Sequence, residues 1–241
     1  MNVLAIIQAR LGSTRLPGKV ALPLGRGRVI DLCANRVARA MWPGGDIRIA
    51  VPRHDMDKLR CASDSLSGEP SPFIGGWYGF PYDGDENDVL GRYIACATSV
   101  KPWPDIVVRI TADCPLVLPE AIQYAVGQVA TSRFASIGDR PIGQRDYFGY
   151  RFLSVRGWDV EAFTMGELLL SSLDDEREHV TTGMRERWQP GEWPDDGPCN
   201  LTLDTQEDYE RLTAIVNQLK DPVTALADEI LKAAEAVRAT V

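Results

Sequence analysis

The chain has 241 residues, 44% of them hydrophobic and 25% charged, and a formal net charge of −8. This composition is typical of a soluble globular protein, and no apolar run approaches the roughly 18 residues of a membrane-spanning helix. The acidic excess argues against nonspecific binding to nucleic acid. We therefore expect neither a membrane nor a nucleic acid as partner.

The beginning of the chain lacks the features of a secretory signal, and the five cysteines include no C-x-x-C pair. Reduced and mostly buried thiols are expected, and the cytoplasm is the expected location. Because α/β folds of this length commonly form one unit, we expect a single domain over residues 1–241.

Residues 3–7 form a continuous apolar run that is too short for an ordinary helix, which predicts a buried parallel strand near the centre of a sheet. Residues 9–19, ARLGSTRLPGK, follow directly. Their cations are Arg10, Arg15 and Lys19. Gly12 allows a close approach of the backbone to an anion, and the loop amides and hydroxyl groups can donate to phosphate oxygens. The loop therefore has the chemistry of a polyphosphate site.

The same loop matches neither of two familiar phosphate motifs, G-x-x-x-x-G-K-[ST] and G-x-G-x-x-G. A basic surface loop with a turn at Pro17-Gly18 would have the same composition. Both interpretations of the loop stay open at this point.

The next elements follow from periodicity. Apolar residues at helical spacing predict a helix over 29–40, then a strand over 46–51 and a short helix over 55–63. Residues 64–82 are rich in Ser, Gly, Pro and aromatic residues without a period, which predicts an ordered loop. Residues 85–99 begin with acids and continue with one apolar face, which predicts an amphipathic helix.

A second buried strand is predicted over 105–110, and it leads into Thr111, Ala112 and Asp113. In an open α/β sheet, residues just past the carboxyl ends of strands line the ligand crevice. Asp113 is therefore a candidate ligand-binding residue. The alternative is that it caps the helix predicted over 119–131.

Residues 133–155 alternate in polarity between glycine breaks, which predicts strands and a hairpin, with an insertion at about 139–157. In the strand predicted over 157–163, alternation places Asp159 and Glu161 on one face. Two carboxylates at this spacing make a plausible site, although an exposed polar strand would look the same.

The last third of the chain carries two further candidates. Residues 174–187 are helix-like and highly charged, and a histidine such as His179 is in this setting more often structural than catalytic. Residues 200–204, NLTLD, predict a short strand that ends at Asp204. Thr205 to Asp208 resembles a capping box for a helix through Leu219, so Asp204 is either a site residue or part of a cap. An alanine-rich helix is predicted over 221–239.

Several of these segments resemble, in order, the SpsF-like cytidylyltransferases of the spore-coat-polysaccharide type, in the superfamily of CMP-Kdo and CMP-sialic acid synthetases. The segments are IIQARLGSTRLPGK, DVLGRY, RITADCP, GWDVEAF, EREHVT and LTLDTQED. In the last one Gln206 replaces the proline that is usual in the family. The resemblance implies a three-layer α/β/α nucleotide-diphospho-sugar transferase fold with a mostly parallel central sheet.

The resemblance also implies an activity, namely transfer of CMP from CTP to an acidic sugar or related acidic acceptor with release of pyrophosphate, for polysaccharide or glycoconjugate biosynthesis. It implies Mg²⁺ held by Asp113 and Asp204. It assigns nucleotide binding to Ala9, Arg10, Gly12, Ser13, Arg15, Lys19 and Thr111, and catalysis to Arg10, Lys19, Asp113 and Asp204. Acceptor-binding candidates are Arg92, Asp159, Glu161 and His179, with Arg140, Arg145 and Arg177 as further cations. A homodimer is expected, with the aromatic region 139–157 as its interface.

Two other functions stay open on the sequence. A glycosyltransferase of the same fold would bind an existing nucleotide sugar, but such enzymes usually carry D-x-D at a strand end, where Thr111-Ala112-Asp113 supplies one acid. A nucleotide-binding protein without catalysis is the second alternative. The full set of charged residues in the loop argues weakly against it.

Overall fold

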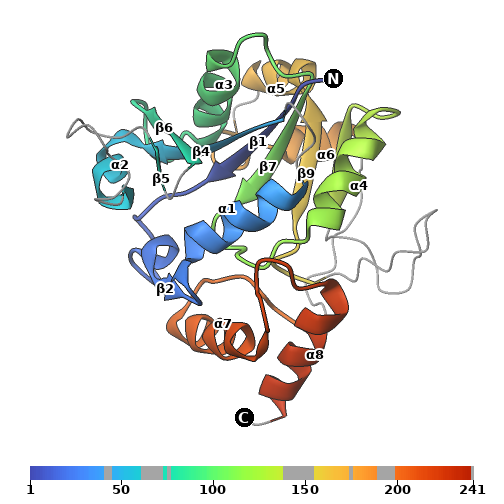
Figure 1. Ribbon diagram of the computed structural model, residues 1–241. Coiled ribbons are helices and arrows are strands. Elements are labelled where there is room, and N and C mark those ends of the chain that lie inside the picture. Colours follow the sequence, from blue (N-terminus) through green and yellow to red (C-terminus); the bar gives the residue numbers. More distant parts are fainter. Residues whose placement is uncertain are drawn as a thin grey trace.

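The computed structural model of this protein describes residues 1–40, 45–60, 73–74, 77–137, 155–173, 176–188 and 199–239. Within these residues a seven-stranded sheet has the order β5-β6-β4-β1-β7-β9-β8 (Figure 1). Its strands are β1 (Val3–Gln8), β4 (Asp46–Pro52), β5 (Phe73–Ile74), β6 (Trp77–Tyr82), β7 (Ile106–Thr111), β8 (Phe134–Ile137) and β9 (Val160–Thr164). A separate two-stranded sheet pairs β2 (Pro23–Leu24) with β3 (Gly27–Arg28).

Helices cover both faces of the large sheet. Helices α1 and α4 pack on one face and α3, α5 and α6 on the other, while α7 and α8 lie below α1 in the view of Figure 1. The helices are α1 (Val29–Ala40), α2 (Arg53–Leu59), α3 (Val89–Ser99), α4 (Pro119–Val129), α5 (Met165–Leu170), α6 (Thr182–Trp188), α7 (Gln206–Gln218) and α8 (Ala227–Arg238), with short 3₁₀ turns η1 (Lys19–Ala21) and η3 (Ser171–Leu173).

Strand β1 shows why two helical layers are needed. Successive side chains of a strand point to opposite faces, and those of Val3, Ala5 and Ile7 enter the core shared with α1 and α4. The side chains of Leu4 and Ile6 enter the core shared with α3 and α5. All of them are buried. The predictions of a central parallel strand and of a three-layer α/β/α fold are confirmed.

The parallel strands bring several loops to one edge of the sheet, here called the carboxyl edge. Strand β1 pairs in parallel with β4 on one side and with β7 on the other, so that Gln8 lies beside both Ala50 and Thr111. Three segments therefore lie at this edge. They are the loop after β1, helix α2 after β4, and the residues after β7, which include Asp113. This is the position at which ligands bind in open α/β sheets.

The prediction that residues 64–82 form a loop is wrong for residues 77–82, which form β6. This strand pairs in parallel with β4, and β5 pairs with only its first two residues, Trp77 and Tyr78. The sequence of β6 is unusual for a strand, because it contains Gly79 and Pro81. Glycine has no side chain to pack, and proline has no N–H group to donate to a neighbouring strand. A proline is tolerated close to the border of a sheet.

The predicted strand over 200–204 is also absent from the sheet. The segment instead crosses the carboxyl edge, where Leu203 N donates to Asp113 O at 2.9 Å and Leu201 N to Arg156 O at 2.7 Å. The side chains of both leucines are buried, which explains the alternating sequence pattern without a strand. This crossing brings Asp204 to the end of β7.

Three predicted helices are shorter than expected. Helix α3 begins at Val89 rather than at residue 85, α6 begins at Thr182 rather than at 174, and α8 begins at Ala227 rather than at 221. Arg140, Arg145 and the predicted hairpin insertion 139–157, apart from its last three residues, lie outside the described residues.

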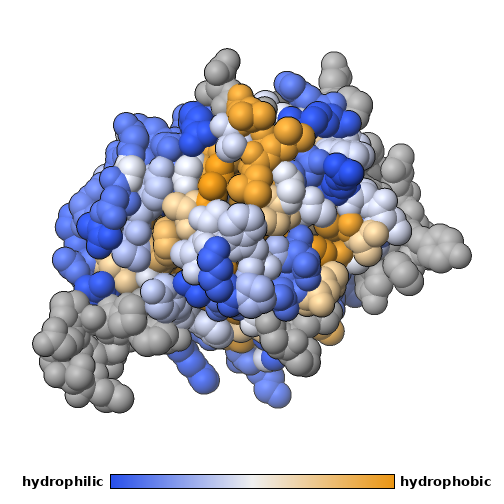
Figure 2. Space-filling view, turned by 90° about the horizontal axis from the view of Figure 1, so that it is seen from above, coloured by the Kyte–Doolittle hydropathy of each residue, from blue (hydrophilic) through white to orange (hydrophobic). Residues whose placement is uncertain are grey.

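The outer surface is mostly polar. Figure 2 views the molecule from the side of α3 and α5 and shows an apolar patch among hydrophilic residues. Leu170 of α5 and Leu173 of η3 are large apolar side chains that are 44% and 80% exposed. In the described part of the chain, no helix combines the length and the apolar character that crossing a membrane requires.

Candidate active site

A cavity of about 380 Å³ opens at the carboxyl edge. It lies within the range of volumes that small-molecule sites occupy. Its wall contains every residue that the sequence assigned to the nucleotide: Ala9, Arg10, Gly12, Ser13, Arg15, Lys19 and Thr111. Asp113 and Asp204 line the same cavity. Residues from both ends of the chain thus meet in one place.

The loop 9–19, here called the nucleotide loop, is shaped by its own backbone. The carbonyl of Leu11 accepts hydrogen bonds from Ser13 N at 2.9 Å and from Gly18 N at 3.0 Å. Gly18 has a φ of 72°, in the left-handed region that favours glycine. The turn at Gly18 leads directly into η1, which begins with Lys19. The loop is therefore closed on itself, with Lys19 directed to the cavity.

Lys19 joins the two candidate aspartates. Its Nζ lies 2.7 Å from Asp113 Oδ2 and 3.0 Å from Asp204 Oδ1, and it also donates to Leu203 O at 2.8 Å. Burial alone would lower the pKa of Lys19, but the attraction of both carboxylates outweighs burial and raises this pKa above its ordinary value. Lys19 is therefore protonated at neutral pH.

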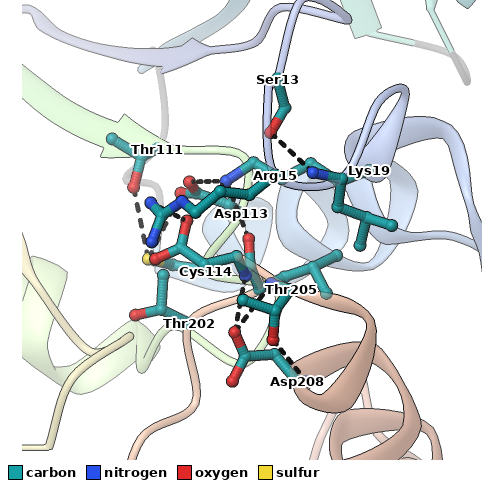
Figure 3. Close-up of polar contacts among 12 residues, drawn as sticks. Ser13, Arg15, Lys19, Thr111, Asp113, Cys114, Thr202, Thr205 and Asp208 are labelled. Carbon is teal, nitrogen blue, oxygen red and sulfur yellow. Dashed lines mark hydrogen bonds and ion pairs between the residues drawn. The ribbon is translucent and has the colours of Figure 1, made fainter.

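Arg15 adds a second cation at the same place. Its Nη2 lies 3.1 Å from Asp204 Oδ1, on a side chain that is 65% exposed. Figure 3 shows Arg15, Lys19 and Asp113 together, with the hydrogen bonds of Thr205 and Asp208 beside them. An exposed guanidinium is held weakly by such a pair, so Arg15 is available to a triphosphate.

The structure also resolves whether the two aspartates are caps. The N-cap of α7 is Thr205, whose hydroxyl accepts from Asp208 N, while Asp208 Oδ2 accepts from the backbone N–H groups of Thr205 and Asp204. The N-cap of α4 is Leu118, without a side-chain hydrogen bond. Neither Asp113 nor Asp204 is a helix cap, so the capping alternatives are wrong. Both carboxylates are directed to the cavity by the elements around them.

Asp113 and Asp204 are the candidate protein ligands for a Mg²⁺ ion in this cavity. Mg²⁺ prefers oxygen ligands and commonly takes one or two carboxylates together with phosphate oxygens and water. Asp113 and Asp204 share Lys19 and supply two such carboxylates. Within the described ranges no group of three or more His, Cys, Asp or Glu side chains is arranged to hold a metal ion. The remaining ligands would therefore have to come from a nucleotide and from water.

Among the cavity residues that the sequence did not assign to the site, two belong to a segment that was predicted as a helix. Glu86 and Asn87 line the cavity, and Asn87 Oδ1 accepts from Arg10 Nη1 at 3.3 Å. The sequence placed both residues inside a helix, but the helix begins only after Asp88, which caps it by accepting from Gly91 N. The acids that resemble a first helical turn belong instead to a loop on the wall of the site.

The structure does not place Arg92 on the cavity wall. Its side chain is fully buried, and Nη2 donates to the carbonyl of Glu86. Among the described residues, Nε and Nη1 have no hydrogen-bond partner. Burial is the main cause that lowers the pKa of Arg92. In this structure Arg92 supports the segment that carries Glu86 from behind, rather than facing an acceptor.

Glu161 is likewise turned away from the cavity. Its buried carboxylate accepts from Arg109 Nη1, Thr181 Oγ1 and Arg185 Nε, each at 2.7 Å. Burial alone would raise the pKa of Glu161, but Arg109, Arg185 and the Thr181 hydroxyl hold it below its ordinary value. Both oxygens accept hydrogen bonds within this network, and Glu161 is not among the residues that line the cavity. This network instead joins β7 and β9 to α6.

The two other acceptor candidates lie outside the cavity wall. Asp159 precedes β9 and accepts from Gly157 N at 3.0 Å. His179 is exposed, and its backbone N–H donates to Glu176 Oε1 at 3.1 Å. The segment around His179 still reaches the rim, because Glu178 Oε1 lies 4.0 Å from Arg10 Nη2.

Comparisons with known proteins agree with this geometry. Residues 4–42 match the family model described as cytidylyltransferase. The chain is 31% identical to the spore coat polysaccharide biosynthesis protein SpsF of Bacillus subtilis, over 95% of this chain and 92% of that protein. It is 33% identical to a 3-deoxy-manno-octulosonate cytidylyltransferase of Anaeromyxobacter dehalogenans, over 59% of this chain and 53% of that protein.

Solved structures give the same result. A cytidylyltransferase from Leptospira borgpetersenii superposes with a TM-score of 0.72 at 26% identity, covering 100% of this chain and 95% of that one. A CMP:2-keto-3-deoxy-manno-octonic acid synthetase in complex with CTP gives a TM-score of 0.57 at 15% identity, covering 90% and 99%, which shows the fold. Fold and site together are those of a nucleotidyltransferase. The chain belongs to the SpsF-like cytidylyltransferases.

Proposed function

We propose that this protein transfers CMP from CTP to an acidic sugar or a related acidic acceptor and releases pyrophosphate. The observation that carries the proposal is the meeting of the nucleotide loop with Asp113 and Asp204 in one cavity. Family membership supports nucleotidyl transfer and disfavours the glycosyltransferase and the non-catalytic alternatives. Polysaccharide or glycoconjugate biosynthesis is the proposed setting.

The chemistry requires positioning and neutralisation of charge. An oxygen of the acceptor attacks the α-phosphorus of CTP, and the bond from this phosphorus to the pyrophosphate oxygen breaks. Arg10 and Arg15 supply positive charge for the triphosphate, and the Ser13 hydroxyl and loop amides can donate to its oxygens. Protonated Lys19 supplies a further positive charge beside both aspartates.

We propose Mg²⁺ as the cofactor, with Asp113 and Asp204 as its protein ligands. When bound it would neutralise charge at the transferred phosphoryl group and lower the pKa of the attacking oxygen. CTP with Mg²⁺ is expected to raise the melting temperature, because a ligand that binds only the folded state stabilises it. EDTA should remove much of this shift. A full shift in the presence of EDTA would contradict the metal proposal.

The experiment that tests the function is pyrophosphate release on mixing the protein with CTP, Mg²⁺ and a set of acidic sugars. We expect release with CTP and with at least one acid, together with a CMP-linked product found by mass spectrometry. UTP, ATP and GTP serve as matched controls for the base. Release with neutral sugars only, or equal use of all four nucleotides, would overturn the proposal.

Three further expectations stay predictions. They are a single domain over residues 1–241, a homodimer and a cytoplasmic location. The expected dimer interface, 139–157, falls almost wholly outside the described residues.

A further inference from the structure

The backbone N–H and carbonyl of Leu11 make three hydrogen bonds that shape the nucleotide loop. Two are local, because the carbonyl accepts from Ser13 N and Gly18 N. The third is long-range, since the Leu11 N–H donates to Asp55 Oδ2 at 2.8 Å, across 44 positions of sequence. Leu11 is thus the point at which the loop is attached to another element of the fold.

Asp55 is unusually placed for an acid in the first turn of a helix. An acid in the first turn commonly stabilises a helix through its attraction to the positive end of the helix dipole, and it does so from an exposed position. Asp55 is only 3% exposed. A buried carboxylate costs free energy unless it is hydrogen-bonded, and the Leu11 N–H supplies a bond of the charge-assisted kind. The buried carboxylate of Asp55 is therefore stabilised by a hydrogen bond from the nucleotide loop.

The topology explains how these residues meet. β4 and β1 are adjacent and parallel, and Ala9 N donates to Ala50 O at 3.1 Å just where the nucleotide loop begins. Helix α2 begins directly after β4, so its first turn stands beside the loop. Asp55 itself is not among the residues that line the cavity.

We propose that Asp55 is a positioning residue for the nucleotide, which holds the loop in its CTP-binding shape through the Leu11 amide. The proposal rests on the proposed function in that the loop binds CTP. Without the carboxylate, the Leu11 N–H loses its partner, and the loop is free to leave the arrangement that directs Arg10 and Ser13 to the cavity, while Lys19 stays held by its own contacts with Asp113 and Asp204.

The variants Asp55→Ala, Asp55→Asn and Asp57→Asn separate this role from general effects on α2. Asparagine keeps an oxygen that can accept from Leu11 N. Asp57 is the matched control, because it lies in the same helix, is 87% exposed and pairs with Arg60 rather than with the loop. Asp55→Leu, which replaces the two carboxylate oxygens by methyl groups, is the second removal variant if alanine fails to fold.

Two measurements are made on each folded variant. Hydrogen exchange of the Leu11 amide is followed without ligand, and CTP affinity is measured by titration. For Asp55→Ala we expect loss of Leu11 protection and CTP binding weaker by about 10- to 100-fold, the scale of one hydrogen bond to a charged group. We expect kcat to change by less than about threefold, since Lys19, Asp113 and Asp204 keep their contacts. Asp55→Asn should restore most of the affinity, and Asp57→Asn should match the wild type.

The outcomes are distinct. An unprotected Leu11 amide in the wild type, or wild-type CTP affinity in both removal variants, overturns the positioning role. A lower melting temperature with unchanged affinity of the folded fraction makes Asp55 merely structural and also overturns it. If the wild type binds no CTP, the proposed function fails, while the exchange of Leu11 still decides whether Asp55 holds the loop.

Discussion

Lys19 and Asp113 are 94 positions apart in sequence, yet the Lys19 ammonium lies 2.7 Å from the Asp113 carboxylate. The same ammonium contacts Asp204, so that a cation from the beginning of the chain separates two acids from later segments. Two carboxylates that share one ammonium in this way would repel each other without it. The site therefore holds two carboxylates and a cation in fixed positions on the wall of one cavity.

Asp113→Asn and Asp204→Asn should each leave the protein folded and lower kcat by ~100-fold or more, the scale of losing one key electrostatic group. Circular dichroism checks the fold, and initial rates of pyrophosphate release measure the activity. The exposed Asp57→Asn variant is the control and should keep full activity. Turnover within threefold of wild type in either site variant would remove that aspartate from the mechanism.

Thr205→Ala should have the opposite profile. Because Thr205 is the N-cap of α7, its loss should lower the free energy of unfolding by about 1 kcal/mol, measured by urea denaturation. Specific activity of the folded protein should stay near that of the wild type. A destabilising effect from Asp204→Asn, and none from Thr205→Ala, would show that the cap has been assigned to the wrong residue.

The main features of the site could be predicted from sequence because they depend on local patterns. An apolar run followed by a small, basic loop indicates where β1 ends. A second apolar run, which forms β7, is followed by Asp113, and this position marks Asp113 as a candidate site residue. The relation between strand ends then places these residues at one edge. The sequence also predicted that Asp204 lies at this edge, but for the wrong reason. Residues 200–204 do not form the predicted strand and instead cross the carboxyl edge of the sheet.

The errors concern contacts between distant segments. Arg109 and Arg185, which surround Glu161, lie 52 and 24 positions away from it, and no pattern around Glu161 announces them. The burial of Arg92 had a signal, because it stands at i+3 from Val89 and i−4 from Cys96, on the apolar face of α3.

The buried network of Glu161 predicts a pH dependence of stability. Its pKa is lowered in the folded state, so its contribution is fully present above the unfolded value near 4.5 and is lost as pH falls through the lower folded value. Glu161→Gln should therefore cost about 3 kcal/mol at pH 7, since it removes the buried carboxylate that pairs with Arg109 and Arg185. Urea denaturation of both proteins from pH 7 to pH 3 should show the difference shrinking in acid. A constant difference would contradict the charged network.

The last prediction concerns the acceptor. Arg177 is the candidate cation that the structure describes near the rim, since Arg92 is buried and Arg140 and Arg145 lie outside the described residues. Its Nε donates to Asp88 Oδ1 at 2.8 Å, and its side chain is 38% exposed. An arginine placed in this way can still offer donors to a carboxylate of the acceptor.

Arg177→Ala should raise the KM for the acidic acceptor by about tenfold at saturating CTP, the scale of one charge-assisted contact, and leave the KM for CTP unchanged. The acceptor KM of Arg177→Lys should lie between those of the wild type and Arg177→Ala, because lysine keeps the charge and loses the planar guanidinium. Arg53→Ala is the matched control, since Arg53 is 60% exposed and forms its ion pair with Asp83. If Arg177 only supports the cap at Asp88, its loss lowers the melting temperature and leaves the acceptor KM at the wild-type value, which would exclude Arg177 from acceptor binding.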